Sequence, residues 1–124
     1  MTVVLDTSFL SDVRGGDEGA RRLLEELVRE GEAALVPSVV VAEYLAGSRQ
    51  PEADFATLDR AVTLEDLRLG DARSAAALAR RMFERGRFPG WIDALVAGFA
   101  KARGDLPVVT KNARHFPESR LRSY

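Results

Sequence analysis

Short apolar runs that alternate with longer helical segments are the feature of this sequence that most constrains its fold. The runs TVVLD, AALVP and LPVVT begin at residues 2, 33 and 106, and each is rich in apolar and β-branched side chains. Runs of this length and composition are typical of buried strands. Because such strands alternate with helical segments, the sequence predicts an α/β fold with a mainly parallel central sheet of four to five strands flanked by helices. We expect residues 1–124 to form a single domain.

The helical segments carry recognisable start and stop patterns. Asp17 and Ser38 are each placed to cap the helix that follows. Residues 71–85 are predicted to form a helix with Met82 and Phe83 facing inward and the arginines facing outward. We also predict helices at 52–61 and 87–104. Residues 62–67 are predicted to form either a strand or a simple connection. Residues 111–124 are predicted to form a loop that includes a helical turn and a last edge strand.

Composition limits the kinds of site that the chain can build. It has no cysteine and a single histidine, His115, which excludes a disulfide framework, a thiolate site and a structural zinc. Any metal would be held by oxygen, which favours Mg²⁺ or Mn²⁺. The apolar start is interrupted at Asp6, too early for a secretory signal, and no stretch reaches membrane-spanning length. We therefore expect a cytoplasmic protein with no membrane contact.

Charge is distributed unevenly along the chain. Residues 1–62 carry 12 acids and 6 bases, a net charge of −6, whereas residues 63–124 carry 7 acids and 12 bases, a net charge of +5. Of the 18 basic residues 16 are arginine, whose planar guanidinium suits phosphate, although arginine abundance is also a compositional bias. This distribution permits a nucleic-acid partner without demonstrating one.

Asp93 is the only charged residue in the apolar run from Trp91 to Ala100. One interpretation is structural, because Asp93 follows Pro89 and Gly90 in the first helical turn, where a negative charge favours the helix dipole. The other is functional, because a helix that is apolar on nearly every face is usually buried, and a buried carboxylate needs partners or a metal.

Two further acids repeat this pattern. Glu43 has Val39 and Val40 before it and Ala46 after it on the same helical face, so it lies on an apolar stripe, or at the border of that stripe in water. Asp6 ends the first predicted strand, where it serves either as a helix cap or as a site residue.

These acids are predicted to converge at one edge of the sheet. Ligands bind outside the carboxyl ends of parallel strands, where Asp6 and the segment Thr110–Asn112 would both lie. Three carboxylates there would repel one another and raise each other's pKa, unless a divalent cation lay between them. A cation held in this way polarises a phosphodiester and activates water, so hydrolysis of a phosphate backbone is the predicted reaction class.

Four segments, in this order and spacing, resemble a PIN-domain ribonuclease: LDTS at 5–8, AEYL around Glu43, IDALVAG around Asp93 and VVTKNARHF at 108–116. More narrowly, the chain resembles the VapC toxins of bacterial and archaeal toxin-antitoxin pairs. The resemblance implies a PIN-like domain with Mg²⁺- or Mn²⁺-dependent endoribonuclease activity, in which Asp6, Glu43 and Asp93 are the catalytic, metal-binding acids. It implies three partners: an RNA substrate, a VapB-like antitoxin presenting arginine to the acidic groove, and a second copy in a homodimer.

The resemblance also bears on the residues around the acids. It implies that Ser8 helps to orient the site through its hydroxyl. The family often has a fourth acid in the segment that here reads TKNARHF, where Asn112 and His115 stand instead, so we expect one tightly held cation. Asn112 still offers a carbonyl oxygen to a metal or its water. Lys111 and Arg114 flank the site as candidates for holding phosphates, although a solvated loop explains them nearly as well.

Trp91 and His115 each have two interpretations. Trp91 beside Asp93 is placed to stack a base, but an aromatic residue in an apolar helix usually belongs to the core. His115 is a candidate general base, but a lone histidine on a terminal loop is more often structural or solvated.

Two other functions compete with the ribonuclease. One is a catalytically weakened or inactive PIN-like module that only binds nucleic acid, although the three retained acids favour activity. The other is a phosphotransfer domain, either an aspartyl-phosphate phosphatase or a receiver, because Asp6 ends a strand and Lys111 follows another. Such phosphatases carry a second acid two residues after the first, where this chain has Ser8, and receivers need paired acids, whereas Thr7 follows Asp6 here.

Overall fold

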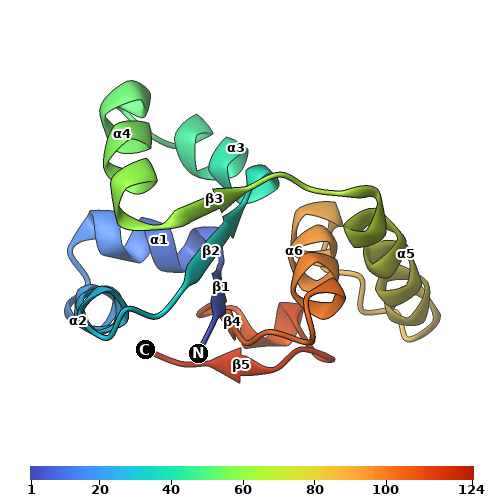
Figure 1. Ribbon diagram of the computed structural model, residues 1–124. Coiled ribbons are helices and arrows are strands. Elements are labelled where there is room, and N and C mark those ends of the chain that lie inside the picture. The colour runs from blue at the N-terminus through green and yellow to red at the C-terminus, as the bar shows by residue number, and fades with distance from the viewer.

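The computed structural model describes residues 1–124 and shows a five-stranded sheet flanked by helices (Figure 1). The elements in chain order are β1 Val3–Leu5, α1 Thr7–Gly15, α2 Glu18–Arg29, β2 Ala34–Pro37, α3 Ser38–Ala46, α4 Pro51–Ala61, β3 Thr63–Glu65, α5 Leu69–Glu84, α6 Trp91–Ala102, β4 Val108–Val109, the 3₁₀ helix η1 Ala113–His115 and β5 Leu121–Arg122. The strand order is β3-β2-β1-β4-β5, and every neighbouring pair is parallel. This confirms the predicted α/β fold with a parallel central sheet.

The central strands form the middle of the core. All residues of β1 and β4 are completely buried. Helices α1 and α2 lie to one side of these strands and α5 and α6 to the other (Figure 1). Parallel strands covered on both faces need apolar side chains in both directions, which explains why the runs at 3–5 and 108–109 do not alternate with polar residues.

The strand order reverses between β1 and β4. From β1 the chain passes through α1 and α2 to β2 on one side, whereas β4 pairs with the opposite side of β1. Such a switch point opens a crevice outside the carboxyl ends of the two strands, which is the usual ligand position in open parallel sheets. Asp6 directly follows β1 and Thr110 directly follows β4, so both residues stand at this point.

Helices α5 and α6 pack closely as a hairpin, and α6 also contacts α3. A Cβ added at Gly98 of α6 would lie 2.5 Å from the backbone nitrogen of Ala75 in α5, far inside van der Waals contact. Only glycine therefore permits this approach. The packing fixes the position of α6, whose first turn carries Asp93.

Several local predictions are corrected by the structure. Asp17 caps α2 as expected, accepting a hydrogen bond from the Ala20 N–H at 2.9 Å. Ser38 caps nothing, because it is the first residue of α3 and its hydroxyl accepts a hydrogen bond from the Leu67 N–H at 3.2 Å. Phe83 does not face inward, since 53% of it is exposed.

Helix α6 begins at Trp91, four residues later than the predicted 87. The segment before it is not helical, because Gly86 and Gly90 both adopt positive φ angles, of 65° and 114°. None of the helices has the length and apolar character needed to cross a membrane.

Candidate active site

Asp6 is the most buried acid of the site, with only 2% of its surface exposed. It occupies the N-cap position of α1, but its side chain makes no capping hydrogen bond. Instead, its Oδ2 accepts hydrogen bonds from Thr110 Oγ1 at 2.8 Å and from Ser8 Oγ at 3.1 Å. The structure therefore does not support the helix-cap interpretation of Asp6.

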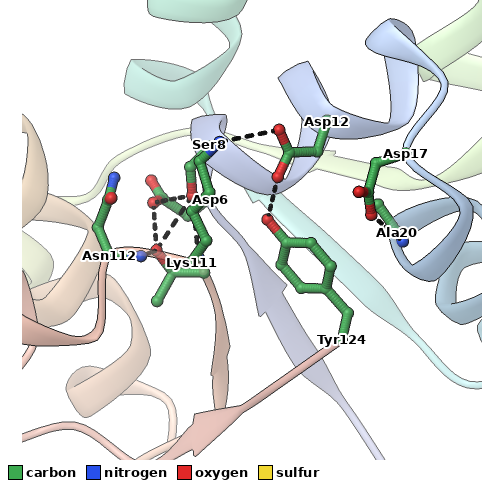
Figure 2. Close-up of polar contacts among 9 residues, drawn as sticks. Asp6, Ser8, Asp12, Asp17, Ala20, Lys111, Asn112 and Tyr124 are labelled. Carbon is green, nitrogen blue, oxygen red and sulfur yellow. Dashed lines mark hydrogen bonds and ion pairs between the residues drawn. The ribbon is translucent and has the colours of Figure 1, made fainter.

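The two hydroxyls are themselves held in place by the loop that follows β4 (Figure 2). The Lys111 N–H donates to Ser8 Oγ at 3.2 Å, and the Asn112 N–H donates to Thr110 Oγ1 at 3.0 Å. Because each hydroxyl accepts a backbone N–H, its own proton is directed toward the carboxylate. Both hydroxyls donate a hydrogen bond to Oδ2 of Asp6, so Oδ1 is left without a side-chain partner.

Burial is the main reason why the pKa of the Asp6 carboxyl is raised above its ordinary value. The hydrogen bonds from Thr110 and Ser8 act in the opposite direction, and the negative charge of Glu43 adds a smaller upward contribution. The surroundings thus stabilise ionised Asp6 in part, and a nearby positive charge would complete that stabilisation.

Asp93 is the third residue of α6, and 19% of its side chain is exposed. Its pKa is also raised, first by burial, then by the charge of Asp6, with a smaller contribution from Glu43, while His115 lowers it. His115 Nδ1 lies 2.7 Å from Asp93 Oδ2. The predicted terminal-loop histidine is therefore a direct neighbour of a site acid.

Glu43 lies on α3 and is exposed, so it stands at the border of the apolar stripe and not within it. Together with residues 89–93 it lines a shallow depression of about 230 Å³. Its charge contributes to the raised pKa values of both Asp6 and Asp93. The acid that follows β1 and the acids on α3 and α6 therefore lie close enough for their charges to interact.

The donor chemistry of this neighbourhood fits a hard divalent cation, although the side chains do not form a finished metal cage. No three Asp, Glu, His or Cys side chains are grouped closely enough to hold a metal ion as they stand. Asp6 and Asp93 nevertheless offer carboxylate oxygens whose mutual repulsion a cation would relieve. Glu43 is exposed and has a long flexible side chain, so it is free to adjust toward such an ion.

Of the three residues predicted to flank the site, Lys111 is held in an ion pair, whereas Asn112 and Arg114 have free side chains. Lys111 Nζ forms an ion pair with Asp12 at 3.0 Å and does not contact Asp6. This position gives no support to the phosphotransfer hypothesis, which rested on Asp6 and Lys111 each following a strand. Asn112 and Arg114 are exposed, and neither side chain makes a hydrogen bond within the protein.

Two features of this site were not predicted from the sequence. Thr110 had been placed at the sheet edge by its position after a strand, but its hydrogen bond to Asp6 spans 104 residues of sequence and leaves no local pattern. Asp12 accepts a hydrogen bond from the Tyr124 hydroxyl at 2.6 Å in addition to its ion pair with Lys111 (Figure 2). These contacts tie α1 to the C-terminal segment.

The fold and site define a small α/β protein with acids gathered at the switch point of a parallel sheet. A family model described as PIN domain matches residues 3–118. The chain belongs to the PIN-domain family. Ribonuclease VapC19 of Mycobacterium tuberculosis (strain ATCC 25618 / H37Rv) is 34% identical to it over 119 residues, which cover 92% of this chain and 91% of that protein.

Solved structures share the same architecture. VapBC2 from Rickettsia felis, bound to a DNA fragment from its promoter, superposes with a TM-score of 0.80 at 21% identity, over 99% of this chain and 98% of that chain. DNA-bound VapBC from Salmonella typhimurium superposes with a TM-score of 0.81 at 23% identity, with the same coverage. At these identities the likeness demonstrates a common fold.

Proposed function

We propose that this chain is a Mg²⁺- or Mn²⁺-dependent endoribonuclease, the toxin of a VapBC-type toxin-antitoxin pair acting in the cytoplasm. The observation that carries the proposal is the buried Asp6, which two hydroxyls orient and whose charge acts on Asp93 across the switch point. The similarity to a ribonuclease over nine-tenths of the chain supports the same reaction class.

Asp6, Glu43 and Asp93 would hold the cation in this proposal. The bound ion would supply polarisation of the scissile phosphate and activation of the attacking water. Ser8 and Thr110 fix the orientation of Asp6, and their hydrogen bonds favour its ionised form against the effect of burial, which raises its pKa. Preorganisation of this kind contributes to catalysis because the charged groups need not rearrange during the reaction.

The basic residues near the site are assigned to the RNA backbone. Arg114 is exposed and unpaired, so its guanidinium is available to a phosphate. Lys111 would have to leave Asp12, but an exposed ion pair of this kind is worth about 0–1 kcal/mol and is readily exchanged. Asn112 contributes an uncharged amide at the same edge.

The direct test is cleavage of single-stranded or looped RNA by the purified, partner-free protein. We expect cleavage with Mg²⁺ or Mn²⁺, none in EDTA, and a loss of about a hundredfold or more for Asp6→Asn and Asp93→Asn. Robust cleavage in EDTA would contradict the metal mechanism. Near-normal rates in both variants would show that the site is elsewhere.

We further propose a VapB-like antitoxin and a second copy of the chain as partners. The acidic neighbourhood of Asp6, Glu43 and Asp93 is complementary to an arginine side chain, which would compete with the cation and the RNA. The similarity in fold to the VapBC structures from Rickettsia felis and Salmonella typhimurium supports this kind of partner. Co-expression with the product of an adjacent short reading frame, followed by co-purification and loss of cleavage, tests the assignment.

One observation favours a second candidate, a PIN-like module that binds nucleic acid without cleaving it. His115 stands in the segment where the family often has a fourth acid, and it contacts Asp93 directly. A protein that binds RNA with normal affinity in Mg²⁺ and leaves it intact would support this alternative.

A further inference from the structure

Three aromatic rings form an unusually exposed cluster where α5 turns into α6. The rings of Phe83 and Phe88 have centroids 4.4 Å apart, and Phe88 and Trp91 have centroids 5.1 Å apart at an interplanar angle of 69°. Phe83 and Trp91 complete the triangle at 6.2 Å. More than half of Phe83 and of Trp91 is exposed, at 53% and 54%. The expectation that Trp91 belongs to the core is therefore wrong.

This aromatic cluster adjoins the acids of the candidate site. Trp91 precedes Asp93 by two residues and lines the same depression as Asp93 and Glu43. Each ring lies against the other two, and the cluster spans the end of α5, the connecting segment and the start of α6. A flat, exposed ring fixed next to a phosphate-processing site is suited to stacking rather than to filling a core.

The charges around the cluster match a polyanion. Residues 80–91 contain four arginines and a single acid, Glu84. Arg81 and Arg85 are paired with Glu118, whereas Arg80 and Arg87 are exposed and form no ion pair, so these two are free to contact phosphates. A second copy of the chain fits this surface less well, because a two-fold contact through it would bring two arginine-containing patches of like charge into one interface.

We propose that Phe83, Phe88 and Trp91 form a stacking platform that binds a base of single-stranded RNA beside the acidic site, with Arg80 and Arg87 placed for the backbone phosphates. This inference rests on the proposed function and specifies how the same site would hold its substrate. Stacking on an aromatic ring accepts any base, so the platform contributes affinity and register rather than a strict sequence preference.

The fluorescence of Trp91 offers a direct test, because it is the only tryptophan in the chain. A short oligoadenylate is titrated into the protein in EDTA, where no metal-dependent cleavage occurs. We expect quenching of the Trp91 emission by oligoadenylate but not by an abasic strand of equal length, which carries the same phosphates. Equal quenching by the two strands would overturn the platform, because the change would then be electrostatic.

Variants provide a second measurement. Trp91→Leu keeps an apolar side chain at an exposed position and is expected to raise the Kd for oligoadenylate about tenfold, without changing the Kd for the abasic strand. The matched control is Phe55→Leu, which alters a 41% exposed aromatic side chain on α4 and should leave both constants unchanged. An unchanged Kd for Trp91→Leu would refute the proposal.

Two further outcomes separate this inference from its alternatives. If Trp91 emission changes with protein concentration without RNA, and Trp91→Leu converts a sedimenting dimer into a monomer, the cluster is an interface between copies and the platform is refuted. Cleavage of the same RNA in Mg²⁺ is measured separately. Cleavage with silent Trp91 emission would contradict only the platform, whereas quenching without cleavage would contradict only the ribonuclease function.

Discussion

Replacing Thr110 with valine tests how a hydrogen bond opposes the effect of burial on the Asp6 carboxylate. The substitution preserves the shape of the side chain but removes the hydroxyl that donates to Asp6 Oδ2 at 2.8 Å. A hydrogen bond to a charged group contributes about 1.5–3 kcal/mol, and Asp6 is too buried for water to replace it fully. The Asn112 N–H also loses its acceptor, but Asn112 is exposed and its N–H can bind water. We expect Thr110→Val to lower the free energy of unfolding by about 2 kcal/mol at neutral pH.

The pH dependence of this loss identifies its cause. The hydrogen bond from Thr110 lowers the pKa of Asp6, opposing the upward effect of burial, so the variant should have a still higher Asp6 pKa. The hydroxyl therefore stabilises the protein most where Asp6 is ionised, and its contribution falls as the pH drops through the Asp6 pKa. We expect a large destabilisation at pH 7 and a smaller one near pH 4.

Urea denaturation in EDTA, at both pH values, measures the effect. Thr110→Ser, which keeps a hydroxyl, is the matched control and should lose less stability at pH 7. In an Asp6→Asn background, Thr110→Val should cost less than it does in the parent, because the charged acceptor is gone. An equal loss at both pH values and in both backgrounds would refute the reasoning, since it would assign the effect to packing.

Four shorter predictions follow from other parts of the molecule. Glu43→Gln should reduce RNA cleavage about a hundredfold while leaving the melting temperature in EDTA unchanged or slightly higher, because Glu43 is exposed and repels its neighbours; a large loss of stability would contradict this. Asn112→Asp should tighten Mg²⁺ binding measured by calorimetry, and an unchanged affinity would remove Asn112 from the site. Gly98→Ala should destabilise the protein by more than about 1 kcal/mol in thermal melts, because its Cβ meets the backbone of α5; a neutral effect would show that the helices separate easily. Without metal, the raised pKa values of Asp6 and Asp93 mean that the folded state binds more protons than the unfolded chain. The free energy of unfolding should therefore fall as the pH rises from about 4 through the raised pKa values, and Mg²⁺ should reverse this fall. A free energy of unfolding that does not change with pH would argue against the raised pKa values.

The sheet was predictable because its signal is local. The runs at 3–5 and 108–109 are fully apolar and consist of valine apart from Leu5, which is what a parallel strand covered on both faces requires. The inward side of α5 was only partly predictable. Met82 is buried as expected, but its neighbour Phe83 is exposed, because a helical pattern locates an apolar face without showing how far the packing partner extends over it.

The acids of the site could be predicted from the sequence, but their hydrogen-bond and ion-pair partners could not. A carboxylate within an apolar run, as at Asp93, can be recognised as unusual from the sequence alone. The hydrogen bond from Thr110 and the ion pair from Lys111 join residues about a hundred positions apart, and several side chains at the sheet edge would have satisfied the same local pattern. Whether Asp6, Glu43 and Asp93 together hold a metal stays a prediction.

The electrostatics of Asp93 favour the functional interpretation over the structural one, although its role in metal binding stays a prediction. An acid that serves a helix N-terminus is stabilised in its ionised form, so the helix would lower its pKa. The pKa of Asp93 is instead raised, first by burial and then by the charge of Asp6. Ionised Asp93 therefore reduces the stability of the metal-free protein at neutral pH, and its contact with His115 offsets only part of that loss. Such an arrangement favours the binding of a cation, because the unfavourable interaction between the carboxylates is released when the cation binds.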